Sequence, residues 1–511
     1  MALLHVAAVQ AGYLLAYLLA VLLLLFFCYC LYVRHVHAKY DHLPGPPRES
    51  FLLGHSRLIA RESRSGRVVH DRFLEWAEKY GPVYRLNFLH YVIVPVYDQE
   101  ATKEILMSPK YAKDKFVYKR LFNMYGTRFL GNGLVTAIDH DLWYRQRRIM
   151  DPAFSSSYLR GLMSTFNERA DRLMDKLAEL AESQSPAMMR ELVNKVTLDV
   201  ITKVAFGVDL DLFHTSNSPF PRAIERCLEG MVHFLRDPVF EYLPQNRKEV
   251  RETRKAVQLL RETGSKWITE RKEAVQNGED VPMDILTQIL KSAEENKSHE
   301  DDWEIMLDNF LTFFIAGQET TANQLAFAIM ELGRLPEIMA KLREEVDEVI
   351  GTKPEVSYED LGNLTYLSQV LKETLRLYPT APGTTRWAAD DIVIDGIKIP
   401  GGFQVVVSVW KKMVMLILQL YLEVKHLVFS QFSSYVSSRL ERFFKDPLKF
   451  DPERFSLDAP KPYFCYYPFA LGPRSCLGQN FSQMEAKVVL AKLVQRFDYT
   501  LLPGQSFDIL D

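Results

Sequence analysis

The N-terminus carries a continuous apolar run, which restricts what the first part of this chain can fold into. From Val6 to Val33 the only strongly polar residue is Gln10. The run exceeds the roughly 20 residues that a helix needs to span a bilayer. A basic cluster follows at once, formed by Arg34, His35, His37 and Lys39. We expect residues 1–40 to be a single transmembrane anchor with a basic stop.

The basic cluster also indicates the orientation of the anchor. A cleavable signal peptide, the alternative, has a shorter apolar core that ends in small residues, so a retained helix is the better interpretation. Lys and Arg collect on the cytoplasmic side of a span. We therefore expect residues 41–511 to form one cytosolic domain held at the endoplasmic reticulum membrane.

Charge and cysteine content exclude two classes of protein. The 511-residue chain has a net charge of −3, so a basic surface that binds nucleic acid is not expected. Its five cysteines are odd in number and irregularly spaced, unlike the disulfide framework of a small secreted protein. A reducing compartment fits this content.

Beyond the anchor, the hydrophobic pattern predicts a fold that is mainly α with small β-sheets. The proline-rich segment 43–47 predicts a stiff hinge. We expect amphipathic helices over 166–182 and 338–350, strands near 91–96 and 392–399, and a solvated charged loop over 291–304.

The stretch Phe469–Gly478 carries the most specific chemistry, with the sequence Phe-Ala-Leu-Gly-Pro-Arg-Ser-Cys-Leu-Gly. A helical pattern follows over 479–497, so Cys476 lies near a helix N-terminus, where the dipole and free N–H groups stabilise a thiolate. Gly472 and Gly478 allow the backbone to approach a flat ligand, and Arg474 can pair with a carboxylate. A lone cysteine in a turn is by default a structural residue, but the whole pattern favours a soft anionic metal ligand.

This pattern resembles the signature of the cytochrome P-450 family. The resemblance implies a haem b cofactor (iron protoporphyrin IX) between a long central helix and the helix after the cysteine loop. Cys476 would then ligate the iron, and Phe469, Arg474 and Gly478 would surround the cofactor. Trp143, Arg147 and Arg386 resemble the remaining contacts to the haem propionates. The implied activity is that of a haem-dependent monooxygenase.

A charged motif supports the same family. Glu373 and Arg376 stand at i and i+3, where two helical side chains can pair, and a surface salt bridge is the ordinary interpretation. The resemblance adds Arg454, from the downstream segment 451–455, and makes the three residues a buried structural network.

Polar residues interrupt an apolar helical pattern over 311–325. Ala316-Gly-Gln-Glu319-Thr320-Thr breaks local rules in mid-helix, which points to a function. Ala316 and Gly317 would leave room for dioxygen, while Thr320 and Glu319 would pass protons to it. A polar helix face beside another element is the alternative.

The electron source and the substrate follow from the resemblance. No Gly-x-Gly-x-x-Gly follows an expected strand, so no nicotinamide or flavin site is predicted. An NADPH-dependent flavoprotein reductase would supply two electrons, and the substrate would be a lipophilic molecule bound by segments near 110–131 and 220–245. The stretches 284–290, 307–332 and 360–378 resemble the family branch that hydroxylates the cholesterol side chain at carbon 24. A fatty acid or a xenobiotic is the alternative substrate.

Two regions depart from the family pattern. Residues 409–434 are expected to be an insertion, whose apolar stretch 413–422 is too short to span a bilayer and would lie on the membrane or promote aggregation. The sequence stops at Asp511, where a further hairpin that lines the pocket is expected. These departures leave open a hypothesis of another class, a haem-binding or misfolded membrane protein without turnover.

Overall fold

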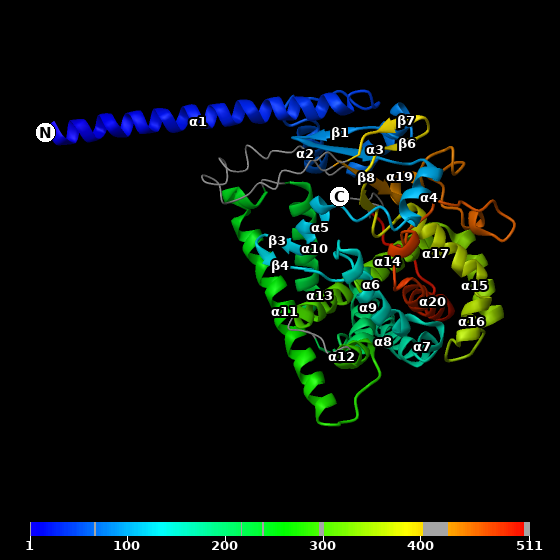
Figure 1. Ribbon diagram of the computed structural model, residues 1–511. Helices are drawn as coiled ribbons and strands as arrows, with labels where there is room; N and C mark the ends of the chain where they lie inside the picture. The colour runs from blue at the N-terminus through cyan, green and yellow to red at the C-terminus, as the bar shows by residue number, and fades with distance from the viewer. Residues whose placement is uncertain are drawn as a thin grey trace. The chain divides into compact units, whose positions relative to one another are not determined.

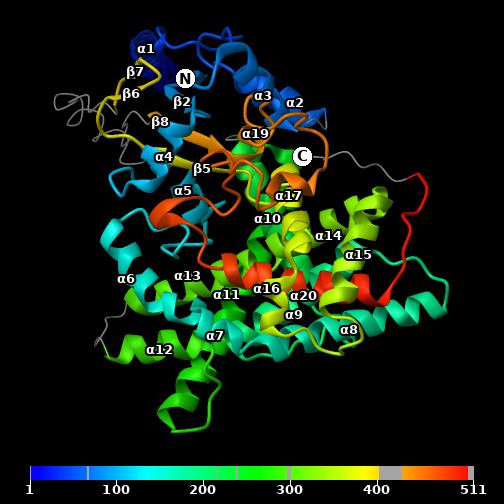
Figure 2. The same ribbon diagram turned by 90° about the vertical axis from the view of Figure 1, so that its right-hand side faces the viewer.

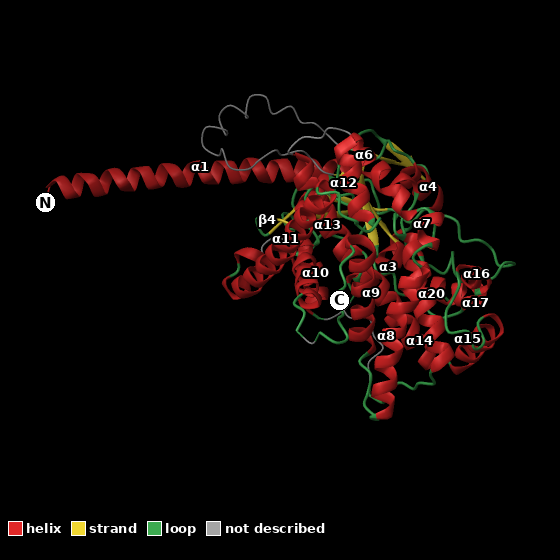
Figure 3. Ribbon diagram, turned by 90° about the horizontal axis from the view of Figure 1, so that it is seen from below, coloured by secondary structure: helices red, strands yellow, loops and turns green. Residues whose placement is uncertain are grey.

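The computed structural model describes residues 2–65, 68–215, 217–237, 240–295, 301–401 and 428–504. Helices make up most of the described chain and the strands form small sheets, which confirms the expected fold class (Figure 3). The described residues form two compact units. The first is built from the chain up to Ala101 and from Thr385 to Phe432, and the second from Thr102 to Thr384 and from Ser433 onward.

The first unit combines the N-terminal helices with short strands. Its elements are α1 (Ala2–Tyr40), α2 (Ser56–Arg64), α3 (Val69–Tyr80), β1 (Leu86–Phe88), β2 (Tyr91–Pro95), β6 (Ile392–Ile394), β7 (Ile397–Ile399) and β8 (Val428–Ser433). Three elements cross the boundary between the units: α4 (Gln99–Met107), β5 (Gly383–Trp387) and β8, whose last residue, Ser433, belongs to the second unit. The sheet has the order β1-β2-β8-β5, with β1 antiparallel and β8 parallel to β2.

The β structure predicted over 392–399 is confirmed and takes the form of a hairpin. β6 and β7 pair antiparallel, with Ile392 opposite Ile399. Asp395 and Gly396 make the turn at φ angles of 51° and 74°. An Asp-Gly pair is a favoured two-residue hairpin turn because both positions need positive φ.

Helix α1 contains the predicted anchor and runs without interruption from Ala2 to Tyr40 (Figure 1). It is long and apolar enough to cross a membrane, with a mean hydropathy of 2.8 in its most apolar window. None of that window is buried against the protein. Its last turns differ, because Val33, Val36 and Tyr40 are buried.

The predicted basic stop is only partly a set of solvated cations. Arg34 and His35 are exposed, but His37 is buried and its Nε2 bonds to the Leu89 carbonyl at 2.8 Å. Lys39 donates to the Gly401 carbonyl at 3.1 Å. The end of α1 is thus anchored to the first unit by hydrogen bonds.

The predicted hinge 43–47 is held in place by backbone contacts. The amide of Arg85 donates to the Pro44 carbonyl at 2.8 Å. A Cβ on Gly45 would meet the Arg85 carbonyl oxygen at 2.6 Å, so this position requires glycine. The segment is fixed to the strand region of its own unit, and its stiffness stays a prediction.

The second unit is a helical body. Its helices are α5 (Lys115–Phe122), α6 (His140–Met150), α7 (Ser156–Arg160), α8 (Met163–Glu182), α9 (Met189–Phe206), α10 (Phe220–Arg236), α11 (Arg247–Gln276), α12 (Ile285–Glu295), α13 (Asp301–Ala316), α14 (Glu319–Arg334), α15 (Pro336–Val349), α16 (Tyr358–Asn363), α17 (Thr365–Leu377), α19 (Ser434–Ser437) and α20 (Gln479–Arg496). A two-stranded ribbon of β3 (Asn123–Met124) and β4 (Thr127–Arg128) lies beside them. Figure 2 shows α20 among α8, α14, α15 and α17, which it contacts.

Most helix predictions are confirmed, and one loop prediction is wrong. The expected helices over 166–182 and 338–350 are α8 and α15. The stretch 291–304 was predicted to be a loop, but 291–295 end α12 and 301–304 begin α13, while 296–300 lie outside the described residues. Charged residues such as Lys and Glu are good helix formers, so charge alone does not predict a loop.

The two departures from the family pattern fall mainly outside the described residues. Of the predicted insertion 409–434, only 428–434 are described, and 428–433 form β8 within the sheet. The residues around the predicted missing hairpin, 505–511, also lie outside the described part of the chain. The division into an anchor over 1–40 and one domain over 41–511 stays a prediction.

Candidate active site

The cysteine loop has a backbone that fixes Cys476 just before α20. The amide of Cys476 donates to the Phe469 carbonyl at 2.8 Å, which closes the loop. Within it, Ala470 and Gly472 have φ angles of 56° and 69°. The helical prediction over 479–497 agrees with α20, whose N-cap is Gly478.

The two glycines of this loop have different reasons to be there. A Cβ on Gly472 would meet the Leu106 carbonyl oxygen at 2.2 Å, so the close approach at this position is to α4. A Cβ on Gly478 would meet nothing closer than Phe154, at 3.9 Å. Gly472 therefore serves protein packing as well as any approach to a ligand, which the sequence did not indicate.

Cys476 combines an open side with protein on its other sides. Its side chain is exposed, whereas Cys465 in the same loop region is buried. The surrounding protein raises the pKa of the Cys476 thiol by removing water, while a hydrogen bond with the Gly478 backbone and the positive charge of Arg147 act in the opposite direction. At this position a free thiolate is disfavoured. A soft metal cation could replace the proton and bind the sulfur instead.

Two arginines and a tryptophan from the predicted set meet at this loop. The Arg474 guanidinium lies 4.1 Å from the centre of the Trp143 ring and donates to the Ala137 carbonyl at 2.8 Å. Arg147 donates from Nη1 to the Ser475 carbonyl at 2.8 Å and pairs with Asp151 at 2.7 Å. The structure thus brings Trp143, Arg147, Arg474 and Cys476 into one neighbourhood.

Arg386 belongs to the first unit and is described only within it. It lies in β5, is 2% exposed, and its Nη1 donates to the Thr385 carbonyl at 3.0 Å. Its predicted role beside the cysteine loop stays a prediction.

The predicted charged network is present. Glu373 and Arg376 on α17 are fully buried and form a bidentate pair at 2.7 and 2.8 Å. The Nε atom of Arg454 lies 3.4 Å from the Glu373 carboxylate. Arg376 also donates to the carbonyls of Ser438, Pro447 and Lys449 at 2.7–3.0 Å. This network ties α17 to the segment that precedes the cysteine loop.

The helix predicted over 311–325 is broken at its polar centre. α13 ends at Ala316 and α14 begins at Glu319, with Gly317 and Gln318 in a turn between them. The Thr320 hydroxyl donates to the Ala316 carbonyl at 2.8 Å across the break. Ala316 is exposed although it lies between buried turns of an apolar helix. A Cβ on Gly317 would meet the Ile201 side chain at 2.6 Å, so Gly317 serves packing against α9.

Glu319 is the first residue of α14, directly after the break, and is partly buried. It accepts a hydrogen bond from Asn323 at 3.2 Å and lies 3.9 Å from the Arg190 guanidinium. With Gln318 it lines a groove of about 1110 Å³ between α8, α9, α14 and the segment 497–504. Neither Cys476 nor Thr320 lines this groove.

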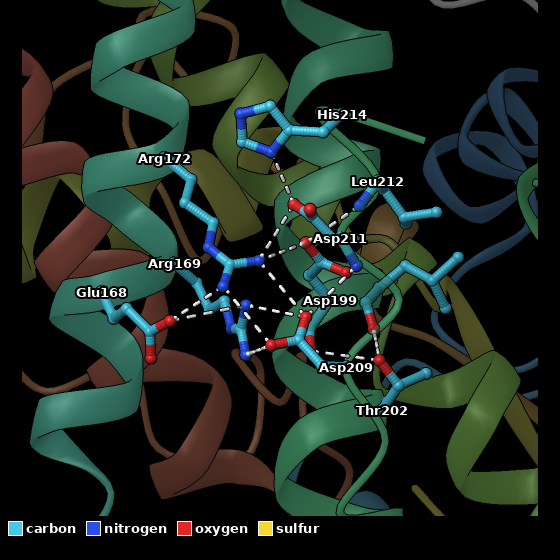
Figure 4. Close-up of polar contacts among 10 residues, drawn as sticks. Glu168, Arg169, Arg172, Asp199, Thr202, Asp209, Asp211, Leu212 and His214 are labelled. Carbon is cyan, nitrogen blue, oxygen red and sulfur yellow. Dashed lines mark hydrogen bonds and ion pairs between the residues drawn. The ribbon is translucent and has the colours of Figure 1, made fainter. Parts of the chain in front are cut away.

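Two buried carboxylates were not indicated by the sequence. One is Asp308 on α13, which binds Arg128 and Arg261. The other is Asp199 on α9, in a charged cluster with Arg169 and Arg172 from α8 and with Asp209 and Asp211 from the following loop (Figure 4). An acidic residue inside an apolar helical stretch is the only signal that could have indicated either residue, because their partners are distant in sequence.

The charged cluster holds two carboxyl groups with opposite pKa shifts. Asp199 is 1% exposed, and burial raises its pKa to about 6 against the attraction of Arg169 and Arg172. Its Oδ1 has no hydrogen-bond partner within the described chain. For Asp209, partial burial acts to raise the pKa, but hydrogen bonds from Arg169 and Arg172 outweigh it and hold the pKa at about 2. The loop after α9 is therefore bound to α8 by charge.

Comparison with known proteins decides the family. A family model for cytochrome P450 matches residues 44–413 and 431–510. The chain belongs to the cytochrome P450 family. The match leaves out 414–430, which lie inside the predicted insertion 409–434.

Curated relatives cover nearly the whole cytochrome P450 chain. Cytochrome P450 4d2 of Drosophila melanogaster is 27% identical over 90% of this chain and 89% of its own length. Human cytochrome P450 3A7 is 28% identical over 94% and 90%, respectively. The protein LUTEIN DEFICIENT 5, chloroplastic, of Arabidopsis thaliana is 29% identical over 83% and 68%.

Membership defines the cofactor and the reaction class. Cytochromes P450 bind haem and use NADPH-derived electrons that reach them through a reductase. They are monooxygenases that act on lipophilic substrates. The residues at the cysteine loop fit haem: Cys476 offers a soft sulfur donor with open space before it, and Arg147 and Arg474 offer guanidinium groups for two carboxylates.

Proposed function

We propose that this cytochrome P450 binds haem through Cys476 and hydroxylates the side chain of cholesterol at carbon 24. The observation that carries the haem site is an exposed thiol at the head of α20 with two guanidinium groups beside its loop. The cholesterol substrate rests on the sequence resemblance in 284–290, 307–332 and 360–378. The names of the relatives described above do not specify a sterol.

The cysteine loop binds and orients the cofactor in this proposal. Its backbone is closed by the bond between Cys476 and Phe469, so the sulfur needs little reorganisation to bind iron. Arg474, stacked on Trp143, and Arg147 would hold the propionates, joined by Arg386. A guanidinium stacked on an aromatic ring loses less conformational entropy when it forms a bidentate pair. When bound, haem supplies the activation of dioxygen with two electrons.

Thr320 would supply the proton nearest to bound dioxygen. In this structure its hydroxyl donates to the Ala316 carbonyl, so it must turn away from that acceptor to donate elsewhere. The break after Ala316 lowers the free-energy cost of losing this hydrogen bond, because the Ala316 carbonyl already lies outside the regular hydrogen bonding of the helix. Gly317, which has no Cβ, lets the break pack closely against Ile201 of α9. Ala316 is exposed and has only a methyl side chain, which leaves space next to the break.

Glu319 would reprotonate the Thr320 hydroxyl with protons taken from solvent. Its carboxylate lies in the groove with Arg190, away from the predicted oxygen site. Rotation of the side chain or a bridging water would connect it to the threonine hydroxyl. A positioned acid of this kind contributes about 10²- to 10⁴-fold to a rate.

The membrane anchor fits a substrate that partitions into lipid. We propose a single pass through the endoplasmic reticulum membrane by α1, with the catalytic units on the cytosolic side, because Arg34 and the following basic residues flank the apolar run. A sterol or another lipophile would then enter from the bilayer rather than from water.

The test is turnover by the full chain in membranes with a reductase and NADPH. Cholesterol, lauric acid and testosterone are supplied separately, and products are identified by mass spectrometry. The proposal predicts a 24-hydroxylated sterol whose formation requires NADPH. A hydroxylated fatty acid or xenobiotic with no sterol product would replace the substrate assignment, because apolar pockets discriminate one methylene by only about 1–3 kcal/mol.

A further inference from the structure

Helix α13 carries a buried carboxylate that the proposed chemistry does not use. Asp308 has no exposed surface and lies N-terminal to the break at Ala316. It accepts two hydrogen bonds from Arg128, at 3.0 Å from Nε and 2.6 Å from Nη2, and one from Arg261 Nη1 at 3.0 Å. One side chain thus joins β4, α11 and α13.

Asp308 also holds the loop that follows β4. The backbone amide of Asn132 donates to its Oδ2 at 2.8 Å. Gly131 packs so closely that a Cβ there would meet the same carboxylate at 2.1 Å, and its φ of 47° is unfavourable for other residues. The segment 129–137, called here the docked loop, therefore lies directly on α13.

Asn309, the next residue of α13, also binds the docked loop. Asn309 accepts a hydrogen bond from the Leu134 amide at 2.8 Å and donates to Gln146 on α6, also at 2.8 Å. Gln146 in turn donates to the Asn132 carbonyl at 2.9 Å. These bonds form a closed network of buried polar groups, in which each partner restricts the others.

The far end of the docked loop reaches the cysteine loop. The carbonyl of Ala137 accepts a hydrogen bond from Arg474 at 2.8 Å, and Arg474 stacks on Trp143. A displacement of the docked loop would therefore change the position of an arginine that contacts the cysteine loop. It would also move a wall of the predicted substrate region 110–131.

The charges around Asp308 explain why a neutral residue would not replace it. Arg128 and Arg261 both also pair with Glu304, at 3.3 and 2.6 Å. Two guanidinium groups thus share two carboxylates, of which only Asp308 is fully buried. Without it, both arginines lose the buried one of their two shared carboxylates and the Asn132 amide loses its acceptor, which is costly in a buried site.

We propose that Asp308 is a positioning residue that fixes the docked loop and α11 to α13, the helix that ends at the proposed oxygen site, and so sets the shape of the substrate pocket and the orientation of Arg474. This inference rests on the proposed haem site at Cys476. It adds a residue that touches neither the cofactor nor the reacting atoms. A lipophilic ligand large enough to reach the docked loop would sense its loss, whereas a small ligand of the iron would not.

The test compares Asp308→Asn with Asp284→Asn in the full-length haem protein. Asp284 is also a buried carboxylate, 4% exposed, and is bound by one arginine, Arg271, at 2.7 Å. It caps the start of α12 through the Thr287 amide and does not contact the docked loop. The measurements are hydrogen exchange of 129–137 by mass spectrometry and optical titration with imidazole and with clotrimazole, a bulky imidazole.

The proposal predicts that Asp308→Asn speeds exchange in 129–137 by about tenfold, the effect expected for loss of hydrogen bonds to a charged group. It also predicts that the Kd for clotrimazole rises about tenfold, while the Kd for imidazole stays within about twofold. Asp284→Asn should change neither quantity. Unchanged exchange and unchanged clotrimazole binding in Asp308→Asn would overturn the proposal.

A second variant covers the case in which Asp308→Asn fails to fold. Gly131→Ala keeps every charge but places a Cβ against the Asp308 carboxylate, so it should raise exchange in the docked loop and weaken clotrimazole binding in the same pattern. A Gly131→Ala protein with normal exchange and normal azole binding would contradict the proposal. If the unsubstituted chain gives no azole spectrum at all, the haem site fails instead, and the exchange data on 129–137 still decide the role of Asp308.

Discussion

Arg376 donates two hydrogen bonds to Glu373, from Nε at 2.7 Å and from Nη2 at 2.8 Å, and neither side chain has exposed surface. A buried pair contributes little when compared with apolar residues, but removal of one partner leaves a buried charge that costs about 3–5 kcal/mol. Arg376 also binds three carbonyls of the segment before the cysteine loop, so its position affects that segment.

We predict that Glu373→Gln reduces the folded, haem-containing fraction by an order of magnitude or more, because about 3–5 kcal/mol is a large share of the stability of a domain. The measurement is the ratio of haem absorbance to protein in the purified membrane fraction. Glu179→Gln is the control, since Glu179 forms an i,i+3 pair with Lys176 on the surface of α8 and should have no effect. Equal haem content in the two variants would show that the network is not required.

Arg474 provides a second prediction, because it combines charge with a stacked geometry. Arg474→Lys keeps the charge but loses the planar fork over Trp143, which lies 4.1 Å away. We expect haem to be lost about tenfold faster, in line with about 1–2 kcal/mol for a partly buried cation–π contact. Transfer of haem to apomyoglobin measures the rate. Arg496→Lys, at 5.9 Å from the Phe497 ring, should keep the parental rate, and a similar rate in both variants would argue against the stacked arginine.

The hydroxyl of Thr320 is predicted to act in proton delivery. Thr320→Val removes the hydroxyl that donates to the Ala316 carbonyl and keeps the side-chain shape. Product formed per NADPH consumed should fall on the order of 100-fold, the lower end of what a positioned proton donor contributes. Thr321→Val is the matched control, because Thr321 is its buried neighbour. Normal coupling in Thr320→Val would remove this residue from the mechanism.

The raised pKa of Asp199 predicts that its effect on stability changes with pH in the opposite direction to that of most carboxylates. Its pKa is raised from 3.8 to about 6 by burial, so the folded protein holds a proton that the unfolded chain releases. Its ionised form therefore destabilises the fold above about pH 6, and the penalty disappears as pH falls towards 4. Asp199→Asn should stabilise the protein by about 1–3 kcal/mol at pH 8 and have no effect near pH 4.

The control for this prediction is Asp209, a carboxyl group in the same cluster whose pKa is shifted in the opposite direction. The pKa of Asp209 is lowered to about 2, so its ionised form stabilises the fold at neutral pH and this contribution is lost only as pH falls towards 2. Asp209→Asn should therefore lower the unfolding temperature at pH 8. Thermal unfolding of the detergent-solubilised chain at several pH values measures both, and a destabilised Asp199→Asn at pH 8 would contradict the assignment.

Local features of the fold followed from the sequence, whereas long-range partners did not. The helix after Cys476 and the pairing of Glu373 with Arg376 depend on residues close in sequence, and both were predicted. The polar residues around Gly317 were interpreted as functional, which stays a prediction, but the break of the helix there was not predicted, because the packing of Gly317 against Ile201 of α9 exists only in the folded chain. Asp308 lies in an apolar helix and gave no specific signal, since Arg128 and Arg261 meet it only in the folded chain.

The central claim is that Cys476 ligates haem iron, and one spectrum tests it most directly. The full chain is expressed in membranes, reduced, exposed to carbon monoxide and measured as a difference spectrum, beside Cys476→Ser and Cys465→Ser. A strongly red-shifted Soret band in the parent and in Cys465→Ser, and its absence in Cys476→Ser, is the predicted result, because a thiolate ligand changes the haem electronics. Folded, haem-supplemented parent protein without that band would contradict the claim and favour a membrane protein that has no monooxygenase activity.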